Sequence, residues 1–155
     1  MRLRLGLLLL TIVALVLWNL RFGPYRLTRM TQNAAREAVE RAQSEYQVEL
    51  DFSEASIAKV EEVAGRARAG GALNEAGRAE LAKLLGVYLG EVARRHHGGQ
   101  WIIPKEGPFQ GALVLQSKRG MTSPPSKVYK RLVDGEGDNL AAYYQVLTRP
   151  AVAVP

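Results

Sequence analysis

The sequence NEAGRAELAKLLGVYLGEVARRHH, residues 74–97, has the pattern of one long helix. Large apolar side chains recur at the spacing of one helix face, at Leu81, Leu84, Leu85, Tyr88 and Val92. A second face carries Ala82, Gly86 and Gly90 at intervals of four residues. Because a glycine inside a helix costs about 1 kcal/mol, these small residues predict close approach by another element. We expect this helix to be the buried centre of the fold.

The residues before this helix predict two helices and one strand. Residues 31–45 (TQNAAREAVERAQSE) have an alanine-rich stripe and predict a connecting helix that lies on the domain or on a membrane surface. Residues 46–52 (YQVELDF) alternate apolar and polar side chains, which predicts a half-buried strand. Residues 54–69 predict a helix with Ser53 as its cap and Gly70-Gly71 as its end.

The residues after the central helix predict two strands and two more helices. QWIIP (residues 100–104) and GALVLQS (residues 111–117) read as strands joined by a turn-rich segment. A short helix with Val128 and Leu132 follows, then an acidic turn, then a last helix capped by Asp138 and stopped by Pro150. This order predicts an α+β fold, with a small antiparallel sheet packed against helices.

An apolar segment near the N-terminus predicts one transmembrane helix before this domain. It begins at Leu5, ends at Leu20 and spans about 24 Å as a helix, which arginines at both ends and Trp18 can extend toward the interfaces. No small residues stand where a signal peptidase would cut, and Arg21 occupies that region. The pattern favours an uncleaved anchor over a cleaved signal peptide or a buried soluble helix.

These segments predict a domain plan and a location. We expect an anchor and flank over residues 1–30, a connecting helix over 31–45, a globular domain over 46–149 and a frayed tail over 150–155. The expected location is the bacterial inner membrane, as a single-pass protein. Arginines lie on both sides of the apolar segment in similar numbers, so the positive-inside rule does not assign the side of the globular domain.

Charge and composition exclude several classes of function. The chain has 21 basic and 15 acidic residues, but five of the basic residues flank the apolar segment, which leaves 16 against 15. The near-neutral remainder predicts no nucleic-acid partner. There is no cysteine, so disulfides, thiolate nucleophiles and cysteine-based metal sites are excluded. Glycine-rich nucleotide loops and the G-x-S-x-G motif of serine hydrolases are absent from the sequence, and we expect no cofactor.

The segment YLGEVARRHHGG, residues 88–99, concentrates polar groups that could belong to a site or to a helix end. His96 and His97 are neighbours, whose side chains diverge by about 100° on a helix, so they are poorly placed to share a metal. Cations in the last turn complement the helix dipole, and the two glycines supply the cap. Glu91 and Arg95 have the spacing of an ion pair. We therefore favour a structural role, with His96 half-buried and hydrogen-bonded.

For two further features we favour a structural role over a binding role. DGEGDN (residues 134–139) begins like a calcium loop, but Asn139 stands where the turn glycine belongs and Gln145 replaces the bidentate glutamate. We expect a helix end there rather than a calcium site, and no other metal site. Four aromatic residues could line a groove but have the spacing of core residues, namely Trp101, Tyr129, Tyr143 and Tyr144.

Three stretches together resemble a small bacterial α+β domain family of unknown function. They are LDFSEASIAKVEEV (residues 50–63), LLGVYLGEVARRHHGGQW (84–101) and SKVYKRLVDGEGDNLAAYY (126–144). The motifs of that family read Y-L-G-E-V, then G-G-x-W, then K-V-x-K-R-L, and the anchor here departs from its usual soluble form. The resemblance implies a compact domain without an assigned activity. The positions that match its motifs, and would form any shared binding surface, are Glu91, Arg94, Trp101, Lys130 and Arg131.

The sequence thus predicts a membrane-anchored, non-enzymatic binding or interaction module. Its expected partners are the lipid bilayer, through residues 5–20, and a protein that the sequence does not identify. The candidate binding surface comprises Glu91, Arg94, His96, Trp101, Lys130 and Arg131. Two alternatives stay open: an enzyme with acid–base chemistry around Glu91 and His96, and an immunity-type protein that binds a toxin.

Overall fold

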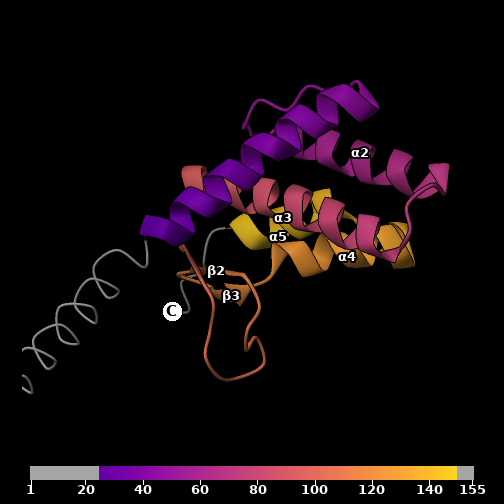
Figure 1. Cartoon of the computed structure of the whole chain (residues 1–155). Helices are drawn as coiled ribbons and strands as arrows, with labels where there is room; N and C mark the ends of the chain where they lie inside the picture. Colours follow the sequence, from indigo (N-terminus) through magenta and orange to yellow (C-terminus); the bar gives the residue numbers. More distant parts are fainter. Residues whose placement is uncertain (1–24, 150–155) are drawn as a thin grey trace, which may run out of the picture.

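The central helix, α3 (Glu75–His97), is surrounded by the other elements of the domain (Figure 1). In the computed structural model, which describes residues 25–149, Asn74 caps α3 by accepting a hydrogen bond from the Gly77 amide at 2.8 Å. Every residue from Leu84 to Ala93 is buried, so this half of the helix is covered on all sides rather than along one stripe. The prediction of a buried central helix is confirmed.

The small residues of α3 allow two close contacts. A Cβ atom at Gly86 would lie 2.4 Å from the Pro125 Cα, and one at Gly90 would lie 2.3 Å from the Trp101 ring. Both distances are far below any normal contact, so only glycine fits at these positions. The element that approaches the α3 backbone is the start of α4 (Pro124–Asp134), together with the indole of Trp101.

Three helices cover α3 from other sides. The described part of the first helix runs over residues 25–46 and buries an alanine stripe at Ala35, Ala38 and Ala42. It therefore lies on the domain, and it includes residues 25–30, which the prediction placed in the anchor flank. α2 (Ser56–Gly70) buries the predicted stripe of Ile57, Val60, Ala64 and Ala67. α5 (Leu140–Thr148) buries Leu140 and Tyr144.

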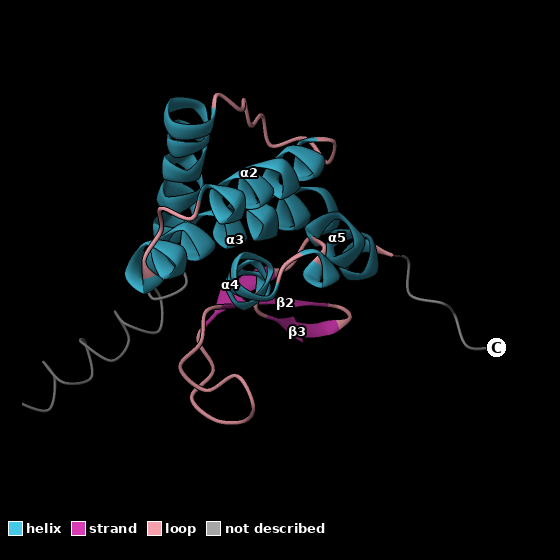
Figure 2. Cartoon of the chain, turned by 90° about the vertical axis from the view of Figure 1, so that its right-hand side faces the viewer, coloured by secondary structure: helices cyan, strands magenta, loops and turns pink. Residues whose placement is uncertain are grey.

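A small antiparallel sheet lies on the side of α4 (Figure 2). Its order is β1 (Gln100–Ile102), β2 (Val114–Ser117) and β3 (Gly120–Thr122), with Trp101 opposite Leu115 and Leu115 opposite Thr122. The first two strands confirm the prediction, whereas the third was not predicted. Within residues 25–149 the fold is α+β, with five α-helices and this three-stranded sheet.

The predicted strand over residues 46–52 is not a strand. Val48 and Leu50 are buried and their neighbours are exposed, so the alternation of burial is real, but no partner strand pairs with this segment. The backbone has positive φ angles of 54° at Gln47 and 62° at Phe52, which interrupt an extended conformation at both ends. Side chains bind this backbone instead, since Tyr88 Oη accepts a hydrogen bond from the Phe52 amide at 2.8 Å.

The residue that caps the last helix differs from the prediction. A 3₁₀ turn, η1 (Glu136–Asp138), joins α4 to α5, and Asn139 caps α5 by accepting from the Ala142 amide at 2.8 Å. Asp138, the predicted cap, instead binds the Lys127 ammonium at 2.5 Å.

The predicted anchor and the predicted tail lie outside the described residues. No helix within residues 25–149 is both long enough and apolar enough to cross a membrane.

Candidate functional site

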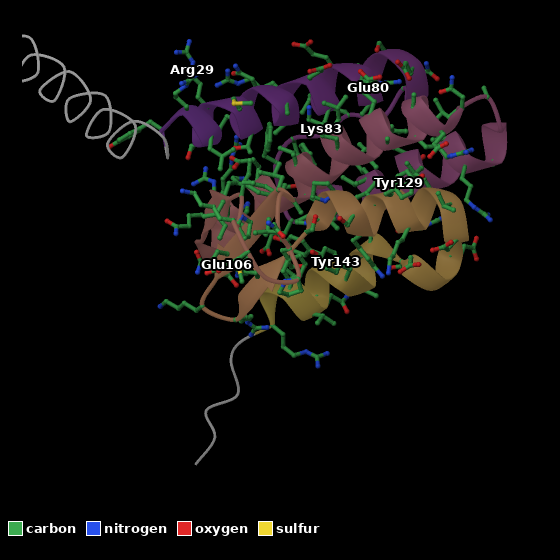
Figure 3. All side chains as sticks on the ribbon, turned by 60° about the horizontal axis from the view of Figure 1, so that its bottom comes forward. Arg29, Glu80, Lys83, Glu106, Tyr129 and Tyr143 are labelled. Atoms are coloured by element: carbon green, nitrogen blue, oxygen red, sulfur yellow. The ribbon has the colours of Figure 1, made fainter. Side chains whose placement is uncertain are left out.

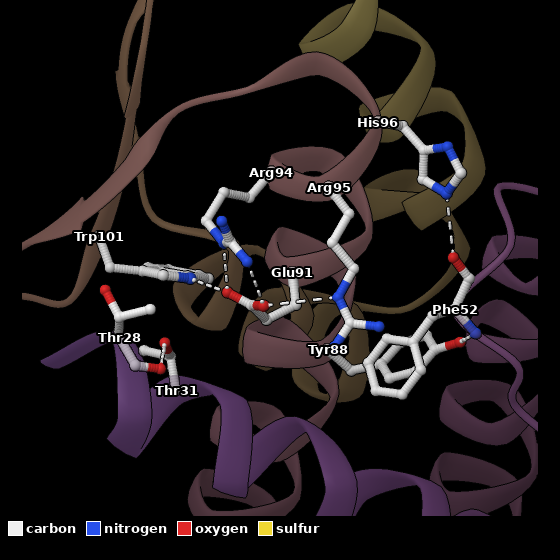
Figure 4. A network of polar contacts seen from close by, with 9 residues as sticks. All are labelled: Thr28, Thr31, Phe52, Tyr88, Glu91, Arg94, Arg95, His96 and Trp101. Atoms are coloured by element: carbon white, nitrogen blue, oxygen red, sulfur yellow. Dashed lines mark hydrogen bonds and ion pairs between the residues drawn. The ribbon is translucent and has the colours of Figure 1, made fainter. Parts of the chain in front are cut away.

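The carboxylate of Glu91 is the centre of a buried polar network on α3 (Figure 4). Glu91 has no exposed surface. Its Oε1 accepts hydrogen bonds from Arg94 Nε at 2.8 Å and Trp101 Nε1 at 2.7 Å, and its Oε2 accepts from Arg94 at 3.0 Å. This bidentate pairing raises the pKa of the Arg94 guanidinium. The network ties α3 to β1.

Arg95 is a weaker partner of Glu91. The predicted pair exists, with Arg95 Nε 3.7 Å from Glu91 Oε2, but Arg94 is closer. The guanidinium of Arg95 stacks on the Phe52 ring at 3.7 Å from its centroid, a cation–π contact that also holds the segment before α2. Both carboxylate oxygens of Glu91 are therefore engaged by protein groups, and the side chain has no exposed surface.

The two histidines lie at the surface and face different partners. His96 is exposed, so the prediction that it is half-buried was wrong, although it does bind the Phe52 carbonyl through Nε2 at 3.1 Å. His97 Nε2 lies 2.6 Å from Glu54 Oε1, an atom that also accepts from Tyr144 Oη at 2.9 Å. Both rings thus join the last turn of α3 to the segment before α2.

These contacts shift two ionisable groups. The hydrogen bond from His97 lowers the pKa of the Glu54 carboxyl below its ordinary 4.5. Burial, together with the hydrogen bond to Glu54, raises the pKa of the Tyr144 hydroxyl. Among residues 25–149, no three acidic or histidine side chains gather closely enough to hold a metal ion.

Arg131 belongs to a second buried network, separate from that of Glu91. It is 5% exposed, and its Nε lies 2.5 Å from Glu61 Oε1. Glu61 Oε2 accepts from the Leu140 amide at 2.7 Å, so one carboxylate joins α2, α4 and the start of α5. Its neighbour Lys130 is exposed. The structure therefore brings Glu91, Arg94 and Trp101 together but divides the six predicted residues among separate places.

The four aromatic residues contribute to the core rather than to a groove. Trp101 and Tyr144 are buried, and Tyr129 and Tyr143 are half-buried against the core (Figure 3). Tyr143 Oη and Thr122 Oγ1 lie 2.6 Å apart, which ties α5 to β3. In the acidic turn, Asp138 binds Lys127 and Asn139 caps α5, so both residues stabilise the junction between α4 and α5.

A cleft that the sequence did not predict lies at the other end of α3. It has a volume of about 470 Å³ and is bounded by the end of α2, the α2–α3 connection, the start of α3 and the end of α4. Its lining residues are Ala67, Arg68, Gly71, Leu73, Arg78, Leu132 and Val133. In Figure 1 the α2–α3 connection lies at the right-hand end of the domain, far from the start of the first helix at the left.

Two arginines of this cleft have no acidic partner. Arg78 donates to the Leu73 carbonyl at 3.0 Å, but its Nε is buried and makes no hydrogen bond. The guanidinium of Arg68 lies against Gly135, where a Cβ would be 3.0 Å from Cζ. In the described part of the chain, neither arginine has a carboxylate within 4.0 Å. Arginine presents a planar set of donors that suits a carboxylate or a phosphate.

Comparison with known protein families, with characterised proteins and with solved structures finds no match for this chain. The resemblance to a small bacterial domain family therefore stays a prediction from the motifs alone.

One weak signal for the cleft was present in the sequence. Arg78 is the fourth residue of α3, where the positive end of the helix dipole disfavours a cation. An arginine in that position suggests another use for its charge. The remaining lining residues come from two segments about sixty positions apart along the chain, a separation that no local pattern joins.

Proposed function

We propose that this chain is a membrane-anchored, non-enzymatic binding module, held at the bacterial inner membrane by residues 5–20. Its partner is a protein that places a carboxylate, flanked by apolar side chains, in the cleft between α2, α3 and α4. The observation that carries the proposal is that Arg68 and Arg78, beside apolar side chains of the cleft, have no acidic partner among residues 25–149.

The chemistry of the cleft favours an amphiphilic anion over a simple one. Leu73 and Val133 provide apolar surface, and the two guanidinium groups lie in the same cleft. A hydrogen bond to a charged group contributes about 1.5–3 kcal/mol, so each arginine is worth roughly ten-fold or more in affinity. Burial of an apolar side chain adds to this in proportion to the area removed from water.

The enzyme alternative has less support than the binding module. It assigns acid–base chemistry to Glu91 and His96, but Glu91 has no exposed surface and His96 binds a backbone carbonyl on another segment. In Figure 4 the His96 ring points to the Phe52 carbonyl, whereas the Glu91 carboxylate points to Arg94 and Trp101. No observation in the described residues favours the immunity-type alternative over other protein partners.

Photo-crosslinking in intact membranes tests the proposal. A photoreactive amino acid is placed at Val133, which lines the cleft and is 45% exposed, or at Val146 on α5, which is 64% exposed and serves as a matched control. We expect a specific crosslinked protein from position 133 only, lost in an Arg68→Gln/Arg78→Gln background and kept in Lys118→Gln. Equal crosslinking from both positions, or persistence in the double variant, would contradict the proposal.

A further inference from the structure

We infer that the face of the domain at the start of the first helix rests on the surface of an anionic lipid bilayer. The inference rests on the proposed anchor and goes beyond it, since an anchor alone leaves the domain free to tumble on its tether. The face has an apolar groove, exposed apolar side chains beside that groove and a surplus of basic residues.

The groove lies between the first helix, α3 and the β1–β2 connection. Its volume is about 220 Å³, and it is lined by Leu27, Met30, Thr31, Ala34, Lys83, Val87, Ile103 and Leu113. Met30 is 65% exposed and Ile103 is 53% exposed, on opposite sides of the groove. Among the lining residues that the structure describes, Lys83 alone is charged. Exposed apolar side chains that gather in one place mark an interaction surface more often than isolated ones do.

The other side of the first helix adds an aromatic residue and further positive charge. Tyr25 is 72% exposed and lies in a shallow hollow with Arg29 and Arg36. Tyrosine is enriched at the level of lipid head groups because its ring is apolar and its hydroxyl is polar. Figure 3 shows Arg29 at the start of the first helix, Lys83 on α3 and Glu106 on the β1–β2 connection.

Charge at this face matches an anionic surface. The exposed basic residues of the first helix and of the β1–β2 connection are Arg26, Arg29, Arg36 and Lys105, and Lys83 adds to them from α3. The exposed acidic residues of the same two stretches are Glu37, Glu40, Glu45 and Glu106, so the basic surplus is confined to the start of the first helix, residues 25–36. Each lysine or arginine near an anionic bilayer contributes about five-fold in partition.

The length of the tether selects a bilayer as the occupant. The apolar segment ends at Leu20 and the described helix begins at Tyr25, and five residue steps cover at most about 18 Å. If residues 5–20 span the bilayer, the start of the first helix cannot leave the neighbourhood of the head groups. The lipid surface is thus present at this face at very high effective concentration, whereas a second copy of the chain is not.

This placement has a consequence for the cleft of Arg68 and Arg78. The cleft lies at the end of the domain opposite to the start of the first helix (Figure 1). A domain that rests on the bilayer by its membrane-side face therefore directs the cleft toward the aqueous phase, where a protein partner can reach it.

Site-specific labelling of the full chain in vesicles tests the inference. The chain has no cysteine, so Ile103→Cys and Met30→Cys each give a single labelled position, and Val146→Cys gives an exposed apolar control. Each variant carries an environment-sensitive fluorophore in vesicles of phosphatidylglycerol and phosphatidylethanolamine whose acyl chains are brominated near the interface. We expect quenching at positions 30 and 103 to exceed that at 146 by about three-fold or more.

The charge component is tested on the same samples. Replacement of Arg29, Lys83 and Lys105 by glutamine should lower the quenching at position 103, and Lys118→Gln on the β2–β3 turn should not. Vesicles of neutral phosphatidylcholine should also lower the quenching at position 103, because the attraction between basic side chains and the bilayer depends on anionic lipid. Equal quenching in neutral and anionic vesicles would overturn the electrostatic part of the inference.

The possible failures are distinguishable from one another. If alkaline carbonate releases the chain from vesicles, the anchor itself fails and the inference fails with it. If the chain is retained but position 103 is quenched no more than 146, the bilayer contact is overturned and the anchor stands. If positions 30 and 103 are shielded from iodide in water yet unquenched by lipid, a second copy or another segment covers the face, which also overturns the inference.

Discussion

The two ends of α3 differ in what surrounds their charged side chains. At the carboxyl end, Glu91 is fully buried and binds Arg94 and Trp101, and His97 binds Glu54. At the amino end, Arg78 shares an open cleft with Arg68. In the described residues, neither arginine forms an ion pair with a carboxylate. A dense cluster of polar residues can thus serve the fold, whereas the two arginines without an acidic partner among residues 25–149 are the ones that we propose bind a partner.

The largest expected effect is at the carboxyl end of α3. Glu91→Gln removes the charge that balances Arg94 and leaves one acceptor where the network uses two. We expect the free energy of unfolding to fall by about 3 kcal/mol, measured by chemical denaturation of the detergent-solubilised chain.

The control for this variant is Glu62→Gln, which removes an exposed ion pair with Arg66 and should cost less than about 1 kcal/mol. If Glu91→Gln keeps its stability and loses its partner, the carboxyl end is the binding end and the comparison is reversed.

A second variant tests whether the predicted surface on α4 is structural. Arg131→Met leaves Glu61 without its guanidinium partner in a site where Arg131 is 5% exposed. The expected loss of stability is about 2–3 kcal/mol, read from the denaturation midpoint. Lys130→Met, on the exposed neighbour, should change stability by less than about 0.5 kcal/mol. Equal effects of the two variants would remove the distinction between them.

The amino end should respond in affinity rather than in stability. Arg68→Gln should weaken the binding of a carboxylate-bearing apolar peptide about ten-fold and change the free energy of unfolding by less than about 0.5 kcal/mol. Arg78→Gln should weaken binding similarly and cost about 1 kcal/mol of stability, because it also removes the hydrogen bond to the Leu73 carbonyl. Isothermal calorimetry measures the affinity, with Lys118→Gln as the charge control.

The smallest expected effect is the pH response of Glu54. Its folded-state pKa is below the ordinary 4.5, owing first to the hydrogen bond from His97. A depressed pKa gives stability that is present above the unfolded value and is lost as pH falls through the folded value. Between about pH 5 and about pH 3, the chain should lose more stability than Glu54→Gln does. An NMR titration of the Glu54 carboxyl carbon that reads above 4.5 would contradict this contact.

The helices and most of the core could be predicted from the sequence because their signals are local. The apolar stripe of α3, the cap at Asn74 and the double glycine at the end of α2 all act within a few residues. The strand predicted over residues 46–52 failed because alternating burial also arises in a segment without a partner strand. β3 was missed because its three residues, Gly120–Thr122, are too short to show a period.

The candidate site was harder to predict because burial depends on distant residues. Glu91 is inaccessible because Trp101 folds over Gly90, and Arg131 is inaccessible because Glu61 on another helix binds it. The sequence shows that these residues are polar, but it does not show that other side chains remove them from solvent. The cleft requires the ends of α2 and α4 to meet the start of α3, which only the tertiary structure shows.

Methyl NMR of the full chain in nanodiscs tests whether the cleft at the amino end of α3 binds a carboxylate. A short peptide with apolar residues and a free carboxyl terminus is titrated beside its carboxamide twin. If the cleft binds a carboxylate, the methyl signals of Leu73, Leu132 and Val133 shift with the carboxylate peptide only, while those of Val92 and Leu115, near the carboxyl end of α3, stay in place. Shifts at Val92 and Leu115, or equal shifts with the carboxamide, would contradict the assignment of binding to the amino end of α3.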